Sequence, residues 1–315
     1  MEATNKSIVW EFILNGFSAG PELKITVFSI TIFLFQIMLA GNMCVIIIIS
    51  ANKCLHLPMY FFLVVLSLTE TLTNVLVIPG VLNIIIKGQM SISRVVCFTQ
   101  SYFYFFLTGT CFLYLGVMSY DRYVAICHPL RYSTIMRKEL CIMLVVGCQL
   151  TMCFCLLYPS IKIVNLPYCS QILDHLFCDS AALMSLACTD VRFLKFYGII
   201  SSLILLLGPL TLTLFSYILI ISTVIRIPSV TGRQKTFSTC LSHLTMVVIV
   251  FSSAIFLEIR PPSYKSVAAN KVVSLGTTML APLANPFVYT LRNENVKAVI
   301  KNMLKQKKNI VIKDK

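Results

Sequence analysis

Seven long segments with almost no charged residues constrain the fold of this chain more than any other feature. A helix that crosses the hydrocarbon core of a bilayer needs about 20 apolar residues, and it satisfies its own backbone polar groups there. The pattern therefore predicts an all-α membrane protein with seven transmembrane helices. We expect these helices at residues 25–52, 57–86, 95–120, 140–161, 196–225, 236–257 and 272–291.

The composition agrees with a membrane protein. Of the 315 residues, 57% are hydrophobic and 12% are charged, whereas a soluble domain carries about 25% charged residues. We expect one seven-transmembrane domain over residues 1–315, with tails at 1–24 and 292–315 around a bundle at 25–291. Residues 292–304 suit a short amphipathic helix on the membrane surface.

The distribution of charge orients the chain. With the N-terminus outside, the inner segments carry 16 Lys and Arg against 4 Asp and Glu, and the outer segments carry 10 against 7. Lys and Arg favour cytoplasmic loops, so we expect an extracellular N-terminus, with Asn5 in a glycosylation sequon, and a cytoplasmic C-terminus. The net charge of +14 then indicates a basic tail that contacts membrane lipids or is solvated. We expect no nucleic acid as a partner.

Four of the 13 cysteines fall at the outer face. An even number of cysteines in an oxidising compartment indicates two disulfides. Their spacing leaves the pairing open. They are Cys97, Cys169, Cys178 and Cys188.

One face of the third segment carries polar side chains at helical spacing. Its outer half holds Ser101, Tyr104 and Thr108, and about 37 Å of helix separates Cys97 from Arg122. Plain packing and the wall of a binding pocket are equally compatible with such a stripe.

Several ordered motifs resemble the rhodopsin-like G-protein-coupled receptors and, within them, the odorant receptors. The most specific is residues 118–127, around Asp121-Arg122-Tyr123. Residues 12–17 and 177–179 resemble the tetrapod-type (class II) group. Further matches lie at residues 55–60, 235–244 and 282–293, so the resemblance covers about residues 12–293.

The resemblance implies a plasma-membrane receptor that binds a small, mostly apolar odorant and activates the olfactory stimulatory G protein, which raises cyclic AMP. It implies no enzyme activity, no cofactor and no metal. It also implies disulfides Cys97–Cys178 and Cys169–Cys188. The residues implied in switching are Asp121, Arg122, Tyr123, Tyr217, His243, Asn285, Pro286 and Tyr289.

We expect the ligand pocket between helices 3, 5, 6 and 7, under the long outer loop. Most candidate residues are apolar or hydroxylic, which suits small uncharged ligands. Lys271, near the expected mouth, is interpreted as a solvated loop charge rather than a ligand contact. The candidates are Ser101, Tyr104, Phe105, Thr108, Ser201, Ser202, Phe251, Ile255, Leu275 and Thr278.

The chain departs from the family at two central positions. Glu70 stands where the family most often has Asp, and Cys111 stands where many members have Glu. A carboxylate inside a membrane is a functional candidate by default. Glu70 could bind a cation together with Asn42 and Asn285, it could be protonated, or it could help couple ligand binding to G-protein activation. We expect the coupling role.

Two other classes of protein are weaker alternatives for this sequence. A transporter or channel usually has paired repeats and a pathway lined by ionisable residues. Seven segments do not divide into two equal repeats, and Glu70 alone does not form such a pathway. A receptor of the same fold for a non-odorant small molecule is the closer alternative. Amine receptors, however, carry an Asp in the outer half of helix 3, and this chain has none there.

Overall fold

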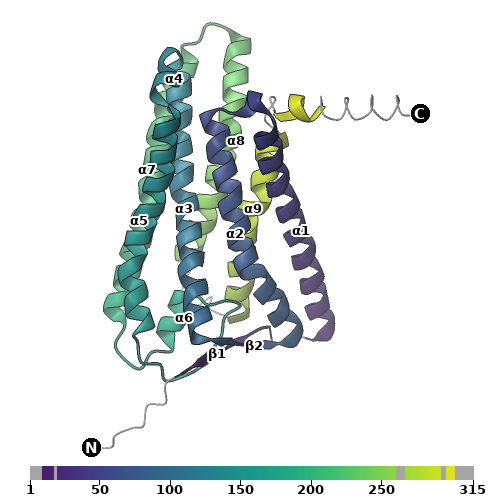
Figure 1. The fold of residues 1–315 in the computed structure, drawn as a ribbon, viewed down its shortest axis with the longest axis vertical. Helices are drawn as coiled ribbons and strands as arrows, with labels where there is room; N and C mark the ends of the chain where they lie inside the picture. The colour runs from purple at the N-terminus through teal and green to yellow at the C-terminus, as the bar shows by residue number, and fades with distance from the viewer. Residues whose placement is uncertain (1–8, 18–19, 260–266, 292–295, 302–315) are drawn as a thin grey trace, which may run out of the picture.

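The computed structural model describes residues 9–17, 20–259, 267–291 and 296–301. In this part of the chain, seven long helices pack side by side as a bundle (Figure 1). The predicted all-α seven-helix architecture is thereby confirmed. The helices are α1 (Pro21–Ala51), α2 (Pro58–Lys87), α3 (Arg94–Cys127), α5 (Lys138–Val164), α7 (Arg192–Ile225), α8 (Val230–Ile259) and α9 (Val267–Leu291).

The apolar character of these helices matches a bilayer. By length and composition, α1, α2, α3, α5 and α7 can each cross a membrane, and α8 contains the shorter apolar stretch Cys240–Phe256. The helices extend beyond the predicted segments: α3 continues past residue 120 to Cys127, and α9 begins before residue 272. Charged residues mark the edge of the bilayer, and a helix can continue past that edge.

Local sequence explains several helix ends. Pro21 and Pro58 open α1 and α2 at the first turn, where a missing N–H costs no hydrogen bond. Gly88 ends α2 with φ of 82°, a left-handed conformation that glycine adopts without steric cost. Ser93 caps α3, because its Oγ accepts a 3.4 Å hydrogen bond from the Val96 N–H.

A small sheet that was not predicted covers one end of the bundle (Figure 1). Strand β1 (Glu11–Asn15) lies between antiparallel β2 (Gln89–Ser93) and parallel β3 (Ile172–Leu173). Phe12 and Leu14 on β1 point into the core, as alternate strand residues do. The sheet fixes the N-terminal segment against the long outer loop.

Two disulfides hold that loop, and both predicted pairings are confirmed. Cys97 at the start of α3 is bonded to Cys178, just before the short helix α6 (Ser180–Ser185). Cys169 is bonded to Cys188 within the loop. The loop is therefore tied to α3 and folded over the bundle.

The opposite end of the bundle carries the short helix α4 (Tyr132–Ile135). Residues 296–301 are helical, and Val296 packs in the apolar core with Val299 and Ile300 at its edge. This part of the predicted amphipathic helix at 292–304 is present. The remainder lies outside the described residues, as does Asn5.

Candidate ligand and coupling sites

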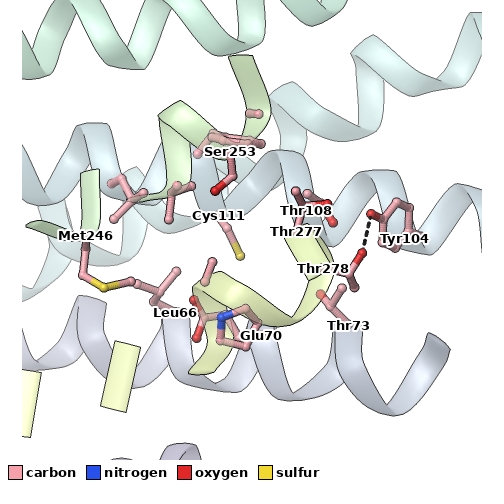
Figure 2. Close-up of a pocket in the computed structure, with 16 residues that line it drawn as sticks. Leu66, Glu70, Thr73, Tyr104, Thr108, Cys111, Met246, Ser253, Thr277 and Thr278 are labelled. Carbon is pink, nitrogen blue, oxygen red and sulfur yellow. Dashed lines mark hydrogen bonds between the residues drawn. The ribbon is translucent and has the colours of Figure 1, made fainter. Parts of the chain in front are cut away.

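A cavity of about 110 Å³ lies within the bundle, between α2, α3, α8 and α9. Its walls combine apolar side chains with several hydroxyl groups and one carboxylate (Figure 2). The lining residues are Leu66, Glu70, Thr73, Tyr104, Thr108, Cys111, Phe112, Leu115, Met246, Val250, Ser253, Ala254, Thr277, Thr278, Ala281 and Pro282.

The cavity has a polar outer end and an apolar inner end. At the outer end the Tyr104 hydroxyl lies 3.2 Å from Thr278 Oγ1 (Figure 2). The ring of Phe177, from the long outer loop, packs 4.7 Å from the Tyr104 ring. Leu66 and Met246 lie at the inner end of the cavity, opposite Tyr104 (Figure 2). Because Phe177 precedes the disulfide-bonded Cys178, the loop over this end is covalently fixed to α3.

Glu70 lies on the cavity wall at the level of Cys111 (Figure 2). Glu70 is 5% exposed, and its Oε2 accepts a 2.8 Å hydrogen bond from Asn285 Nδ2. Asn42 Nδ2 donates to the Pro282 carbonyl at 3.1 Å, so α1, α2 and α9 meet here. The described residues contain no group of three or more His, Cys, Asp and Glu that could hold a metal ion.

The structure separates the predicted pocket residues into several places. Tyr104, Thr108 and Thr278 line the cavity described above. Leu275 packs in the outer apolar core instead. Ser101, Phe105, Ser201 and Ser202 line a second hollow of about 120 Å³. Phe251 and Ile255 line a third hollow of about 260 Å³.

The central cavity differs from the expected pocket in one of its walls. Helix 5 of the prediction, α7, contributes no residue to the central cavity, and α2 provides that wall instead. Thr73 from α2, Ser253 and Thr277 are polar lining residues that the sequence-based prediction left out. Glu70, predicted as an ion or coupling residue, lies on the same wall. The signal that pointed to α2 was the rarity of a carboxylate deep in a membrane.

Lys271 also differs from its prediction, because it is buried rather than solvated. Its side chain is 4% exposed, and Nζ lies 2.5 Å from Oδ1 of Asp174 in the outer loop. Nζ also donates to the Gly16 carbonyl at 2.8 Å. One ammonium group thus joins α9, the loop and the N-terminal segment above the bundle.

At the inner end of α3, the predicted switch residues Asp121 and Arg122 form a closed network with Tyr132, a residue that the sequence-based prediction did not name. Arg122 Nη2 lies 2.6 Å from Asp121 Oδ2, and Tyr132 donates a 2.8 Å hydrogen bond to Oδ1 of the same carboxylate. Asp121 is fully buried. Burial, followed by the charge of Asp121, raises the pKa of Tyr132 well above its usual range.

Other predicted switch residues pair nearby. The Tyr217 hydroxyl lies 3.0 Å from His243 Nδ1, with the two rings stacked at 5.9 Å. The Tyr123 hydroxyl lies 3.1 Å from His128 Nε2. The backbone of Tyr289 belongs to α9, but its side chain lies outside the described residues.

Gly41 makes a close contact between α1 and the Asn285-Pro286 motif of α9. A Cβ atom at Gly41 would lie 2.9 Å from two atoms of the Pro286 ring. The glycine therefore allows an approach that no other residue permits without movement.

Comparison with known proteins gives a consistent result. A family model described as olfactory receptor matches residues 31–307. Human olfactory receptor 6S1 is 41% identical over 298 residues, which cover 94% of this chain and 90% of that protein. Human olfactory receptors 6X1 and 10A3 are 40% and 37% identical and cover 95% and 98% of the chain, and 96% and 98% of their own lengths.

Proposed function

Because the chain belongs to the olfactory receptor family, we propose that it couples a small, mostly apolar volatile ligand in the bundle to the olfactory stimulatory G protein. It is an odorant receptor and a multi-pass membrane protein, not an enzyme. Activation of this G protein raises cyclic AMP.

One observation supports this mechanism more than any other: α3 contributes residues both to the central cavity and to the Asp121–Arg122 network at the inner end of the bundle. Thr108 lies at the central cavity, and Arg122 lies at the inner end, paired with a buried carboxylate. A ligand can shift a two-state bundle only by binding one state more tightly. The ligand acts on the outer half of α3, and release of Arg122 from Asp121 exposes the guanidinium to the G protein.

The ligand-binding residues of this proposal are those that line the cavity, Tyr104, Thr108 and Thr278 among them. Removing the Thr108 hydroxyl removes at most one ligand hydrogen bond, worth about 0.5–1.5 kcal/mol. Thr108→Val should therefore change the odorant dose by about two- to tenfold. It should leave the maximal response unchanged.

The orientation is part of the proposal. The N-terminus is extracellular, with Asn5 glycosylated, and the C-terminus is cytoplasmic. Glycosidase treatment should raise the gel mobility of the wild type and leave Asn5→Gln unchanged. Staining of a C-terminal epitope on unpermeabilised cells would reverse this orientation.

The coupling mechanism is tested with Arg122→Ala in a cyclic AMP reporter assay. At wild-type surface levels this variant should give no odorant-dependent response, because no guanidinium can leave Asp121 for the G protein. Arg131→Ala, which removes an exposed charge on the same face, is the control and should respond normally. A wild-type maximum from Arg122→Ala would refute the mechanism.

A further inference from the structure

A groove runs between α7 and α8, outside the central cavity. A hollow of about 510 Å³ lies near the inner ends of these two helices, and the third hollow, of about 260 Å³, lies farther along them. Tyr217 and Leu244 line both hollows, so the two adjoin, and together they are called the α7–α8 groove. The groove shares no lining residue with the central cavity.

The groove opens on the lipid-facing side of the bundle. Ile221 and Ile225 on α7 and Leu241 on α8 line its inner hollow, and all three are exposed. Leu214 and Val248 are exposed in the same way in the adjoining hollow. Lipid tails are as apolar as leucine side chains, so exposed apolar residues on transmembrane helices contact hydrocarbon. The groove is therefore filled from the bilayer.

The walls of the groove present almost only hydrocarbon. The Tyr217 hydroxyl donates a 3.1 Å hydrogen bond to the Cys240 carbonyl, and Ser252 donates to the Ile249 carbonyl at 3.2 Å. Thr213 is fully buried. Because these hydroxyl protons are used within the protein or lie below the surface, the length of the groove suits an apolar chain.

The inner end of the groove is polar and basic. Arg233 and Gln234 line it, and both are exposed. Arg226, at the end of α7, is also exposed. Residues 191–257 contain no Asp or Glu. The connection between α7 and α8 lies at the same end of the bundle as α4 (Figure 1), which is the cytoplasmic end in the orientation proposed above. This end complements an anionic group.

An anionic phospholipid of the cytoplasmic leaflet combines an apolar chain with such a group. A guanidinium can bind a phosphate through two parallel hydrogen bonds, and the anionic cytoplasmic leaflet attracts basic segments beside transmembrane helices. An apolar cavity of about 150 Å³ binds benzene, and the inner hollow is about three times as large. It therefore has room for a much longer hydrocarbon chain than benzene provides.

We propose that the α7–α8 groove binds an anionic phospholipid of the cytoplasmic leaflet, with one acyl chain against Ile221 and Leu241 and the phosphate at Arg233. The proposal goes beyond the odorant-receptor function and rests only on the orientation given above. A molecule that binds the folded chain raises its Tm. Tyr217, whose hydroxyl contacts His243 on α8, forms part of the groove wall, so the bound lipid stabilises the packing of α7 on α8.

The first test measures the Tm of the detergent-solubilised full chain with dioleoylphosphatidylserine and with dioleoylphosphatidylcholine, which has the same chains and no net charge. The serine lipid should raise the Tm at lower concentration. Arg233→Gln should weaken the apparent affinity for the serine lipid about fivefold, the equivalent of about 1 kcal/mol for one basic residue at an anionic lipid surface. Arg131→Gln, which changes another exposed arginine at the same end, should keep the wild-type preference.

The second test fills the groove and counts bound lipid by native mass spectrometry, which does not depend on the Tm of the variant. Ile221→Trp places a large ring in the inner hollow and should remove the bound serine lipid. Ile218→Trp makes the same change at an exposed position on α7 that lines neither hollow, and it should bind as the wild type does. If Ile221→Trp does not fold, Arg233→Gln decides the question.

Three outcomes would overturn the site. Equal effects of the two lipids on the wild type would mean that the groove holds annular lipid without a head-group preference. A serine-lipid preference that survives in Arg233→Gln would place the lipid elsewhere, for example on the basic tail. An equal Tm rise from glycerophosphoserine, which has the head group and no chains, would indicate a soluble anion.

The orientation fails separately from the site. Staining of the C-terminal epitope on unpermeabilised cells would overturn the assignment to the cytoplasmic leaflet, whatever lipid the groove binds in detergent. Absence of any odorant response at normal surface levels would refute the proposed function and leave the lipid measurements unchanged.

Discussion

Removing the Tyr132 hydroxyl should raise the activity of the receptor in the absence of ligand. This hydroxyl donates a 2.8 Å hydrogen bond to Asp121 Oδ1, and Arg122 occupies the other oxygen at 2.6 Å. In Tyr132→Phe the buried carboxylate keeps Arg122 but loses its second donor. The closed arrangement of the inner end is then less stable, while an open arrangement without this contact is unaffected.

The magnitude follows from the charge of the acceptor. A hydrogen bond to a charged group contributes about 1.5–3 kcal/mol, which corresponds to about a 10- to 150-fold change in the equilibrium between closed and open states. If about 0.1% of unliganded receptors are open, as in a typical two-state protein, Tyr132→Phe raises that fraction to about 1–13%. Such a change is large enough to see in a reporter assay.

The assay is ligand-free cyclic AMP, normalised to receptor at the cell surface. Tyr120→Phe is the matched control, because the Tyr120 hydroxyl forms no hydrogen bond with another described residue. Its basal signal should equal that of the wild type. Basal signal in Tyr132→Phe at or below the wild-type level, with normal surface expression, would refute the view that this contact stabilises the closed state.

Two other predictions concern packing at the ends and centre of the bundle. Lys271→Met should speed amide hydrogen exchange in β1, because the N-terminal segment and the outer loop lose the ammonium group that both contact. Lys195→Met, which changes an exposed lysine, is the control, and its exchange in β1 should match the wild type. Gly41→Ala should lower the Tm of the solubilised chain through about 1–3 kcal/mol of overpacking against Pro286. Gly147→Ala, where the added Cβ meets nothing within 4 Å, should be neutral or gain about 0.5–1 kcal/mol of helix stability; equal Tm changes in the two glycine variants would contradict the packing argument.

The helices could be predicted because the bilayer imposes a simple rule on sequence. Long uncharged segments marked all seven, and the outer cysteines indicated two disulfides. The three-stranded sheet escaped prediction for the opposite reason. Its strands are short, and β1 pairs with β2 nearly eighty residues away, so no local pattern shows that Phe12 and Leu14 face a core.

The lining of the central cavity was predicted less completely than the fold, because periodicity assigns a residue to a helix face but does not say which neighbouring helix that face meets. Ser101 and Thr108 share a stripe on α3, yet they line different hollows. Lys271 resembled a solvated loop charge, and its partner Asp174 is about a hundred residues away in sequence. The separation of Ser101 from Thr108 and the burial of Lys271 both depend on how the helices and the outer loop pack against one another.

The cavity and the inner network are close enough for a small displacement to act on both. Met246 on α8 lines the cavity, and His243, bonded to Tyr217, lies one turn farther in, about 4.5 Å along the axis. On α3 about 10 Å of helix separates Leu115 at the cavity from Arg122. A ligand that changes the spacing of α3 and α8 therefore reaches the Tyr217–His243 and Asp121–Arg122 pairs through one or two turns of rigid helix, without a longer chain of contacts.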